Sequence, residues 1–281
     1  MAKMTPEARS ETLIEALPYI QQYRGHTFVI KYGGSAMEDE LVVDKFLRDV
    51  VFLEAVGINP VLVHGGGKAI TAKMKAAGLV AHFIDGLRAT NEAAIHIVEE
   101  ALDREINPSI VQKVRDFGGR AQGFSGKDVF MARKLERQAV IDGETIDIGF
   151  VGEAEGVNAS AVAKAVHAEI VPVISPIGST REGVVLNINA DIAAASLAAE
   201  LKASKLIYVT DVAGIMRDPA QPDSLISSVT IAQIEELIER KVIAGGMIPK
   251  VRSATEALKN GVGKIHMIGG HIQHIIGNLE G

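Results

Sequence analysis

Cysteine and tryptophan are both absent from the 281 residues of this chain, and aromatic residues make up only 4% of it. A chain without cysteine can form no disulfide, no thiolate metal site and no cysteine nucleophile. Such a composition fits the reducing environment of a cytoplasm. Because aromatic rings are so scarce, we expect no surface on which nucleic-acid bases stack.

Runs of basic charge and long apolar segments are also missing. The formal net charge is −6 and no cluster of five basic residues occurs, which argues against binding to nucleic acid or to a membrane surface. No apolar run approaches the roughly 20 residues that a membrane-spanning helix needs. The first residues, MAKMTPEARSE, have no apolar core of the kind found in signal peptides, so we expect a cytoplasmic protein.

The common nucleotide-binding and metal-binding motifs do not occur either. A P-loop fails at the segment HGGGKAI because Ala69, not serine or threonine, follows Lys68. The dinucleotide fingerprint G-x-G-x-x-G fails there as well, since Ile70 occupies the third glycine position. None of the eight histidines has the spacing H-E-x-x-H, and a structural role is expected for His64, the one beside the glycines.

The chain does contain a signal for a helix near its N-terminus. Thr5-Pro6 is typical of a helix start, and Leu13, Leu17 and Ile20 fall on one helical face. Pro18 lies inside this pattern and should kink the helix. We expect the apolar stripe to be buried against the body of the chain or against another subunit.

From Thr27 onwards, short apolar strands alternate with amphipathic helices. Strands are predicted at 27–32, 60–63, 170–175, 205–212 and 264–268, and Asp142-Gly143 is a hairpin turn signal. Buried strands that alternate with helices predict an α/β fold with an open, largely parallel sheet between two helical layers. Ligands of such sheets bind at the carboxyl ends of the strands, where the polar and glycine clusters of this chain fall.

Two glycine turns follow the first two of these strands. In VIKYGG, Lys31 precedes Gly33 and Gly34, and in VLVHGGGKAIT three glycines stand between a strand and a helix. Exposed backbone N–H groups at such turns, beside a lysine, suit a phosphate or another anion. Plain structural turns with a lysine that reaches solvent are the alternative.

Two further motifs carry polar side chains. In GLRAT, Arg88 could hold a carboxylate with its planar guanidinium or form a surface ion pair, and Thr90 is the expected cap of the next helix. In LNINAD, Asn187 and Asn189 share one strand face, and Asp191 falls in the first turn of a helix. The alternative for LNINAD is two turn residues and a helix-capping aspartate.

The last two motifs are VTDVAGI at 209–215 and GGMIPK at 245–250. An aspartate and a glycine after a strand are typical of a nucleotide-binding edge. The alternative is that these residues form only a turn. In GGMIPK two glycines precede a helix and Lys250 falls in its opening turns. A helix start with an exposed lysine is the alternative.

The order of these motifs along the chain is more specific than any one of them. It runs K-x-G-G, H-G-G-G, G-L-R-x-T, N-x-N-A-D, T-D-x-x-G-I and G-G-M-x-x-K. From about Arg24 to about Gly270 the chain resembles the amino acid kinase superfamily. The combination of VIKYGG, GLRAT and NINAD resembles the branch that phosphorylates N-acetyl-L-glutamate.

The resemblance implies a fold and a domain organisation. The fold would be the carbamate kinase-like one, an open and mainly parallel sheet of about eight strands between helices. Residues 1–25 would form the kinked N-terminal helix and residues 26–180 an N-terminal lobe that binds the acid and dimerises. Residues 181–281 would form a C-terminal lobe that binds ATP. Mg²⁺ would be held mainly by the ATP phosphates, with no metal ligand from the protein.

The resemblance also implies the reaction and its residues. The γ-carboxylate of N-acetyl-L-glutamate would attack ATP to give N-acetyl-L-glutamyl 5-phosphate, a step of arginine biosynthesis. The implied catalytic residues are Lys31, Asp191 and Lys250. The implied acid-binding residues are Gly66, Gly67, Arg88 and Asn187. The implied nucleotide-binding residues are Gly33, Gly34, Thr210, Asp211, Gly214, Gly246 and Met247.

A homodimer is the assembly that the resemblance implies, and the N-terminal helix resembles that of the arginine-inhibited members, which are hexamers made of three dimers. In those members arginine is a feedback inhibitor that binds near this helix and the C-terminal segment. They continue past the last strand with a longer tail, whereas this chain stops at HIIGNLEG. We therefore expect part of the effector pocket to be missing or built differently.

Three other interpretations stay open on the sequence alone. A superfamily kinase for a different small acid is disfavoured by Arg88 and by the pattern at 187–191. A catalytically silent sensing module is disfavoured because Lys31, Asp191 and Lys250 are all present. A dinucleotide-dependent oxidoreductase is disfavoured by the missing third glycine.

Overall fold

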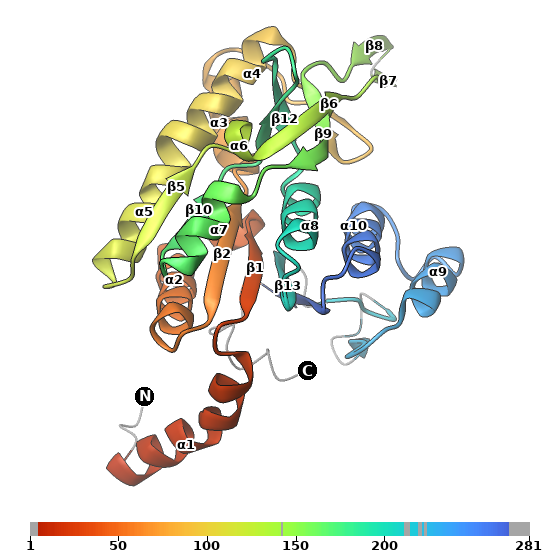
Figure 1. Cartoon of the computed structure of the whole chain (residues 1–281). Helices are drawn as coiled ribbons and strands as arrows, with labels where there is room; N and C mark the ends of the chain where they lie inside the picture. The colour runs from red at the N-terminus through yellow and green to blue at the C-terminus, as the bar shows by residue number, and fades with distance from the viewer. Residues whose placement is uncertain (1–4, 142, 211–213, 219–220, 222–223, 270–281) are drawn as a thin grey trace.

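Six parallel strands form the central sheet of the chain, in the order β14-β13-β1-β2-β10-β5 (Figure 1). This computed structural model describes residues 5–141, 143–210, 214–218, 221 and 224–269. The six strands are β1 (Thr27–Tyr32), β2 (Asn59–His64), β5 (Ala121–Phe124), β10 (Val171–Ile174), β13 (Lys205–Thr210) and β14 (Lys264–Gly269). The predicted open, largely parallel sheet is thereby confirmed.

Four more strands close into a smaller group beside the sheet. They are β6 (Phe130–Lys134), β9 (Val151–Val157), β11 (Ile177–Ser179) and β12 (Val185–Ile188). A side chain at Gly178 would meet Ile188 Cδ1 at 2.6 Å and Ala132 Cβ at 2.9 Å, so this glycine lets the strands approach closely. The strands expected in one sheet of about eight are therefore divided between a six-stranded sheet and this group.

Two short hairpins complete the β structure. One consists of β3 (Phe83–Ile84) and β4 (Leu87–Arg88), joined through Asp85 and Gly86, both of which have positive φ. The other consists of β7 (Gln138–Ile141) and β8 (Glu144–Asp147), so the hairpin predicted at this turn is confirmed.

Helices cover both faces of the central sheet. On one face, α2 (Glu40–Ala55) and α5 (Asn107–Asp116) pack on alternate strand residues such as Phe28, Ile30 and Leu62. On the other face, α7 (Ser160–His167), α8 (Ala190–Glu200) and α10 (Met247–Lys259) pack on residues such as Val29 and Leu206. The strand residues alternate between the two faces as the pleat requires.

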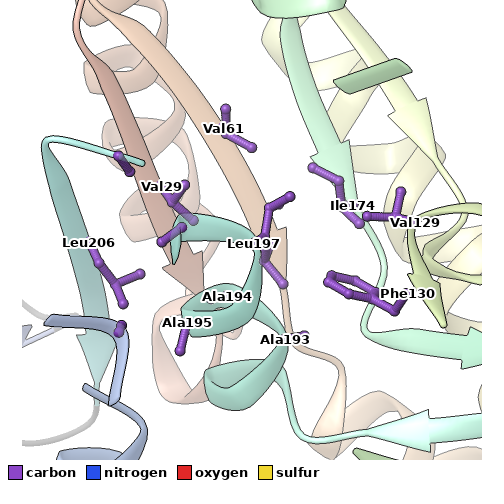
Figure 2. Packing of buried hydrophobic residues seen from close by; sticks show 14 of the residues in the cluster. Val29, Val61, Val129, Phe130, Ile174, Ala193, Ala194, Ala195, Leu197 and Leu206 are labelled. Carbon is purple, nitrogen blue, oxygen red and sulfur yellow. The ribbon is translucent and has the colours of Figure 1, made fainter. Parts of the chain in front are cut away.

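Helix α8 lies close to the sheet because its buried face is built mainly of alanine. Ala193, Ala194, Ala195 and Leu197 face the apolar strand residues (Figure 2). Small side chains allow a helix backbone to approach its neighbours, and burial of each apolar group stabilises the packing. The N-terminus of α8 is thereby held at the carboxyl edge of the sheet.

The remaining helical segments connect these layers. They are η1 (Gly34–Met37), α3 (Gly67–Ala76), α4 (Glu92–Glu99), the π-helix η2 (Glu100–Ile106), α6 (Gly126–Val129) and α9 (Ile231–Glu239). No helix among the described residues combines the length and the apolar character that a membrane crossing needs.

The N-terminal helix α1 (Pro6–Tyr23) contains Pro18 and extends away from the rest of the chain (Figure 1). Its apolar side chains Leu13 and Leu17 are 64% and 47% exposed. Within the described part of one chain, therefore, the stripe is not buried against the body. The expected division at residue 180 into two lobes stays a prediction, and the central sheet takes strands from both sides of it.

A matched pair of substitutions in α2 tests the packing of this layer. Leu47 is 0% exposed, and Leu47→Ala should lower the free energy of unfolding by about 2–5 kcal/mol because it leaves a cavity. Leu41 lies in the same helix but is 70% exposed, so Leu41→Ala should change that free energy by less than about 0.5 kcal/mol. Denaturant unfolding measures both, and equal losses would contradict this packing.

Candidate active site

The carboxyl ends of β1 and β2 bring the two glycine turns together. Tyr32 and His64 pair at the ends of these parallel strands. A side chain added at Gly33 would lie 3.4 Å from Gly65 Cα and 3.1 Å from Lys31 Nζ. The turns therefore approach each other at van der Waals distance, and a larger residue at Gly33 would crowd the lysine.

Three charged side chains meet beside these turns. Lys31 comes from β1, Asp191 from the first turn of α8, and Lys250 from α10. Lys31 Nζ lies 3.1 Å from Asp191 Oδ1, and Lys250 Nζ donates to Asp191 Oδ2 at 2.5 Å. The structure thus brings together all three predicted catalytic residues as one ion-paired triad.

Asp191 stays ionised although its side chain is mostly buried. Burial alone would raise the pKa of its carboxyl group, but the charges of Lys31 and Lys250 and their hydrogen bonds outweigh burial and lower the pKa. Asn189 caps α8 by accepting from the backbone N–H of Asp191 at 2.9 Å, which fixes where the carboxylate points. The capping residue is therefore Asn189, and Asp191 is free to hold the lysines.

Tyr208 supports the triad, and sequence reasoning did not identify it. Its hydroxyl donates to the backbone oxygen of Asp191 at 3.4 Å and lies 3.2 Å from Ser253 Oγ. Its ring centre is 5.3 Å from Lys250 Nζ, within the range of a cation–π contact. Burial raises the pKa of Tyr208, so the hydroxyl stays protonated. The signal in the sequence that could have pointed to Tyr208 was a tyrosine among the aliphatic residues of β13.

A cleft of about 850 Å³ opens on one side of the triad. Its lining includes Lys31, Gly66, Gly67, Arg88, Asn187 and Asp191. All four residues expected at the acid substrate therefore lie along one cleft that ends at two of the three triad residues.

Arg88 is a buried cation in the wall of this cleft, and only 8% of it is exposed. Its Nη2 donates to Gly67 O at 2.7 Å and to Thr71 Oγ1 at 2.9 Å, and the guanidinium lies over the ring of Phe83. Burial lowers the pKa of Arg88. Arg88 is buried, and among the described residues no ion pair joins it to a carboxylate, so the alternative of a surface ion pair is wrong.

Asn187 and Thr90 lie next to Arg88. Asn187 Nδ2 donates to Thr90 Oγ1 at 3.3 Å, and Thr90 Oγ1 donates to Arg88 O at 2.8 Å. The expectation that Thr90 caps the next helix is wrong, since Asn91 caps α4 by accepting from Ala94 N. Thr90 instead pairs with Gly149 in an isolated β-bridge, and its side chain is buried.

A second cleft, of about 240 Å³, lies on the other side of the triad. Among its lining residues are Gly33, Gly34, Thr210, Gly246 and Lys250. The residues that line both clefts are Lys31, Gly34, Gly86, Asn189 and Asp191. The two clefts therefore meet at the triad.

Three residues expected at the nucleotide are not among those that line the smaller cleft. Met247 is the first residue of α10, directly after Gly246. Gly214 is buried, and a side chain there would meet Leu225 Cδ1 at 2.8 Å. Asp211 lies outside the described residues.

His64 is buried in the interior and lines neither cleft. Its Nδ1 lies 3.0 Å from Gly65 O, and its Nε2 lies 3.3 Å from Asn107 Nδ2. Asn107 Nδ2 also donates to Val173 O. Burial lowers the pKa of His64 to about 4, so the ring is neutral at pH 7. This geometry supports the structural role expected for it.

The amino acid kinase family model matches residues 26–269, so the chain belongs to the amino acid kinase family. Relatives that match along most of both chains include acetylglutamate kinases. The one from Akkermansia muciniphila is 47% identical over 271 residues, which cover 95% of this chain and 90% of the relative. The one from Aquifex aeolicus is 44% identical over 278 residues, which cover 95% and 92%.

Solved structures agree on the fold. An N-acetylglutamate synthase from Neisseria gonorrhoeae, complexed with coenzyme A and N-acetyl-glutamate, superposes with a TM-score of 0.80 at 25% identity. The match covers 94% of this chain but only 59% of that one. A carbamate kinase from Giardia lamblia bound to AMP-PNP superposes with a TM-score of 0.65 at 18% identity, over 88% of this chain and 93% of that one. The predicted family and fold are confirmed.

The buried histidine makes stability depend on pH. Unfolded histidine has a pKa of about 6.5, so between pH 6.5 and 4 the unfolded chain binds a proton that folded His64 does not. The contribution of neutral His64 to stability is full above pH 6.5 and is lost progressively as the pH falls toward 4. His64→Gln cannot titrate and should make the pH dependence of the unfolding free energy shallower.

Denaturant unfolding of both proteins between pH 4 and 7 measures this effect. Part of the slope should remain in His64→Gln, because burial also lowers the pKa of His266 to about 4. An identical slope in the two proteins would show that His64 is not buried in its neutral form.

Proposed function

We propose that this chain transfers the γ-phosphoryl group of ATP to the γ-carboxylate of N-acetyl-L-glutamate, which forms N-acetyl-L-glutamyl 5-phosphate for arginine biosynthesis. The observation that carries the proposal is the triad of Lys31, Asp191 and Lys250 at the junction of two clefts. The acetylglutamate kinases that are 44–47% identical over most of the chain support the choice of substrate.

The larger cleft would bind the acid. Arg88 is a buried guanidinium with no ion-paired carboxylate among the described residues, and it would hold the α-carboxylate with Asn187 nearby. The backbone N–H groups at Gly66 and Gly67 would face the other end of the acid. Leu102 and Ile106 leave no room for a side chain at Gly66, which keeps that backbone accessible.

Phosphoryl transfer needs positioning and neutralisation of charge more than it needs covalent chemistry from the protein. Lys31 and Lys250 would flank the transferred group and neutralise the charge that develops on it, while Asp191 holds both ammonium groups in place. The attacking γ-carboxylate is already ionised at pH 7, since its ordinary pKa is about 4. The reaction therefore requires no general base.

The smaller cleft would receive the phosphates of the nucleotide. Gly33, Gly34, Thr210 and Gly246 line it or its entrance, and Asp211, Gly214 and Met247 are proposed to contact the rest of ATP. Mg²⁺ would be carried by the ATP phosphates, where it would offset their charge. Among the described residues, no group of three or more histidine or carboxylate side chains is placed to hold a metal.

A cytoplasmic homodimer is the proposed form of the enzyme. The exposed stripe of α1, including Leu13 and Leu17, supports contact with another subunit and hence a hexamer of three dimers. Arginine is proposed as a feedback inhibitor on the resemblance of this helix to that of arginine-inhibited members. The residues after Gly269 that would complete an effector pocket lie outside the described part of the chain.

Formation of an acyl phosphate, trapped as a hydroxamate, tests the reaction. N-acetyl-L-glutamate should support ATP-dependent product formation, whereas glutamate, aspartate and a mixture of bicarbonate and ammonia should not. Turnover of another acid alone would keep the chemistry but overturn the assignment of Arg88 and Asn187. An absence of turnover with every acid would indicate a silent sensing module. Arginine added to the active assay tests inhibition.

Lys31→Ala separates catalysis from binding. Because Lys31 neutralises charge that develops in the transition state, kcat should fall by about 100-fold or more while KM changes by only a few-fold. Lys164→Ala on α7, away from both clefts, is the control and should retain the activity of the parent enzyme. A near-normal kcat in Lys31→Ala would rule out this role.

A further inference from the structure

The guanidinium of Arg88 is held in place by neutral groups on one segment of chain. Gly67 O, Thr71 Oγ1 and Met74 Sδ all come from α3, and they lie 2.7, 2.9 and 3.6 Å from nitrogens of the guanidinium. Since none of these groups carries a charge, they fix the position of the cation without neutralising it. Its charge is left for a ligand in the cleft.

Thr71 closes a ring of hydrogen bonds around Arg88. Thr71 Oγ1 donates to Gly67 O at 2.8 Å and accepts from Arg88 Nη2, which also donates to Gly67 O. Both protons of Nη2 are therefore used within the protein. Nη1 donates one proton to Met74 Sδ, so Nε and the second proton of Nη1 remain for a carboxylate. The ring sets the orientation of the guanidinium plane.

The same segment of chain carries the glycine turn at the other end of the site. Gly67 follows Gly65 and Gly66, and Gly65 packs against Gly33 next to Lys31. The carboxylate-binding end and the phosphoryl end of the cleft are thus joined through the start of α3. A shift of Arg88 against α3 would change the distance from the guanidinium to Lys31 at the phosphoryl end, and with it the length of acid that the cleft accepts.

We propose that Thr71 is a positioning residue that sets the chain length of the acid substrate by fixing Arg88 against the glycine turn. This inference rests on the proposed function, because it assumes that Arg88 binds the α-carboxylate. Thr71 itself need not touch the substrate. It acts through the guanidinium of Arg88, which its hydroxyl holds in place.

A purely structural role for Thr71 makes a different prediction. Threonine in a helix often donates to the carbonyl oxygen four residues earlier, as Thr71 does to Gly67, with little effect beyond the helix. In that case loss of the hydroxyl would alter the stability of α3 and would leave the preference between acids unchanged. Kinetics with acids of two lengths separate the two roles.

The experiment compares Thr71→Val with Thr71→Ser in the full chain. Valine keeps the shape of threonine but cannot hydrogen-bond, whereas serine keeps the hydroxyl. In Thr71→Val the KM for N-acetyl-L-glutamate should rise about three- to tenfold with the KM for ATP unchanged. This is less than the full effect of one lost hydrogen bond to a charged group, because Arg88 Nη2 still donates to Gly67 O. Its preference for N-acetyl-L-glutamate over N-acetyl-L-aspartate, one methylene shorter, should fall by a similar factor.

In Thr71→Ser, the KM for N-acetyl-L-glutamate and the preference for it over N-acetyl-L-aspartate should lie within about twofold of the parent enzyme. A change of about twofold is smaller than the effect of one neutral hydrogen bond. An unchanged preference in Thr71→Val, or equal increases of KM for the acid and for ATP, would overturn the proposal while the parent enzyme's turnover still supports the proposed function. If the parent enzyme shows no turnover with N-acetyl-L-glutamate, the proposed function and this inference both fail.

Discussion

One buried carboxylate between two buried ammonium groups is the constraint on which the site depends. Asp191 lies within 3.1 Å of Lys31 Nζ and 2.5 Å of Lys250 Nζ, and all three side chains are mostly buried. Removing charges from water is costly unless they are paired, and here two positive charges share one negative charge. The excess of positive charge favours an anion at the same place, which is what a transferred phosphoryl group supplies.

The packing of the fold holds these three side chains together. Lys31 is the next-to-last residue of β1, which has a neighbouring strand on each side. Asp191 and Lys250 lie in the opening turns of two helices that pack on the same face of the sheet. Alanines on α8 bring its N-terminus to the sheet edge, and Asn189 then sets the direction of Asp191. The glycine turns fit beside Lys31 because they carry no side chains. The site is therefore assembled from elements far apart in the sequence.

Local signals in the sequence were sufficient for most elements, whereas the members of the triad were implied by the resemblance to the amino acid kinase superfamily. Helix α2 begins after the Asp39 cap and ends before Gly57, because capping and positive φ act within a few residues. The partition of the strands into a sheet and a smaller group, the contacts of Tyr208 and the bridge from Thr90 to Gly149 depend on packing between distant segments. Contacts between distant segments leave no periodic pattern of apolar residues in the sequence, so such a pattern could not predict them. Likewise, the sequence indicated a carboxylate site at Arg88 but not that Thr71 and Gly67 hold it.

A double-mutant cycle on kcat tests the central claim most directly. If Asp191 acts by holding Lys31 and Lys250 in place, Lys31→Ala and Asp191→Asn remove parts of one unit. The double variant should then be no more than about tenfold slower than the slower single variant, because strongly coupled groups are not additive. If the losses of the two single variants instead multiply in the double variant, the residues act independently and the triad is not the functional unit.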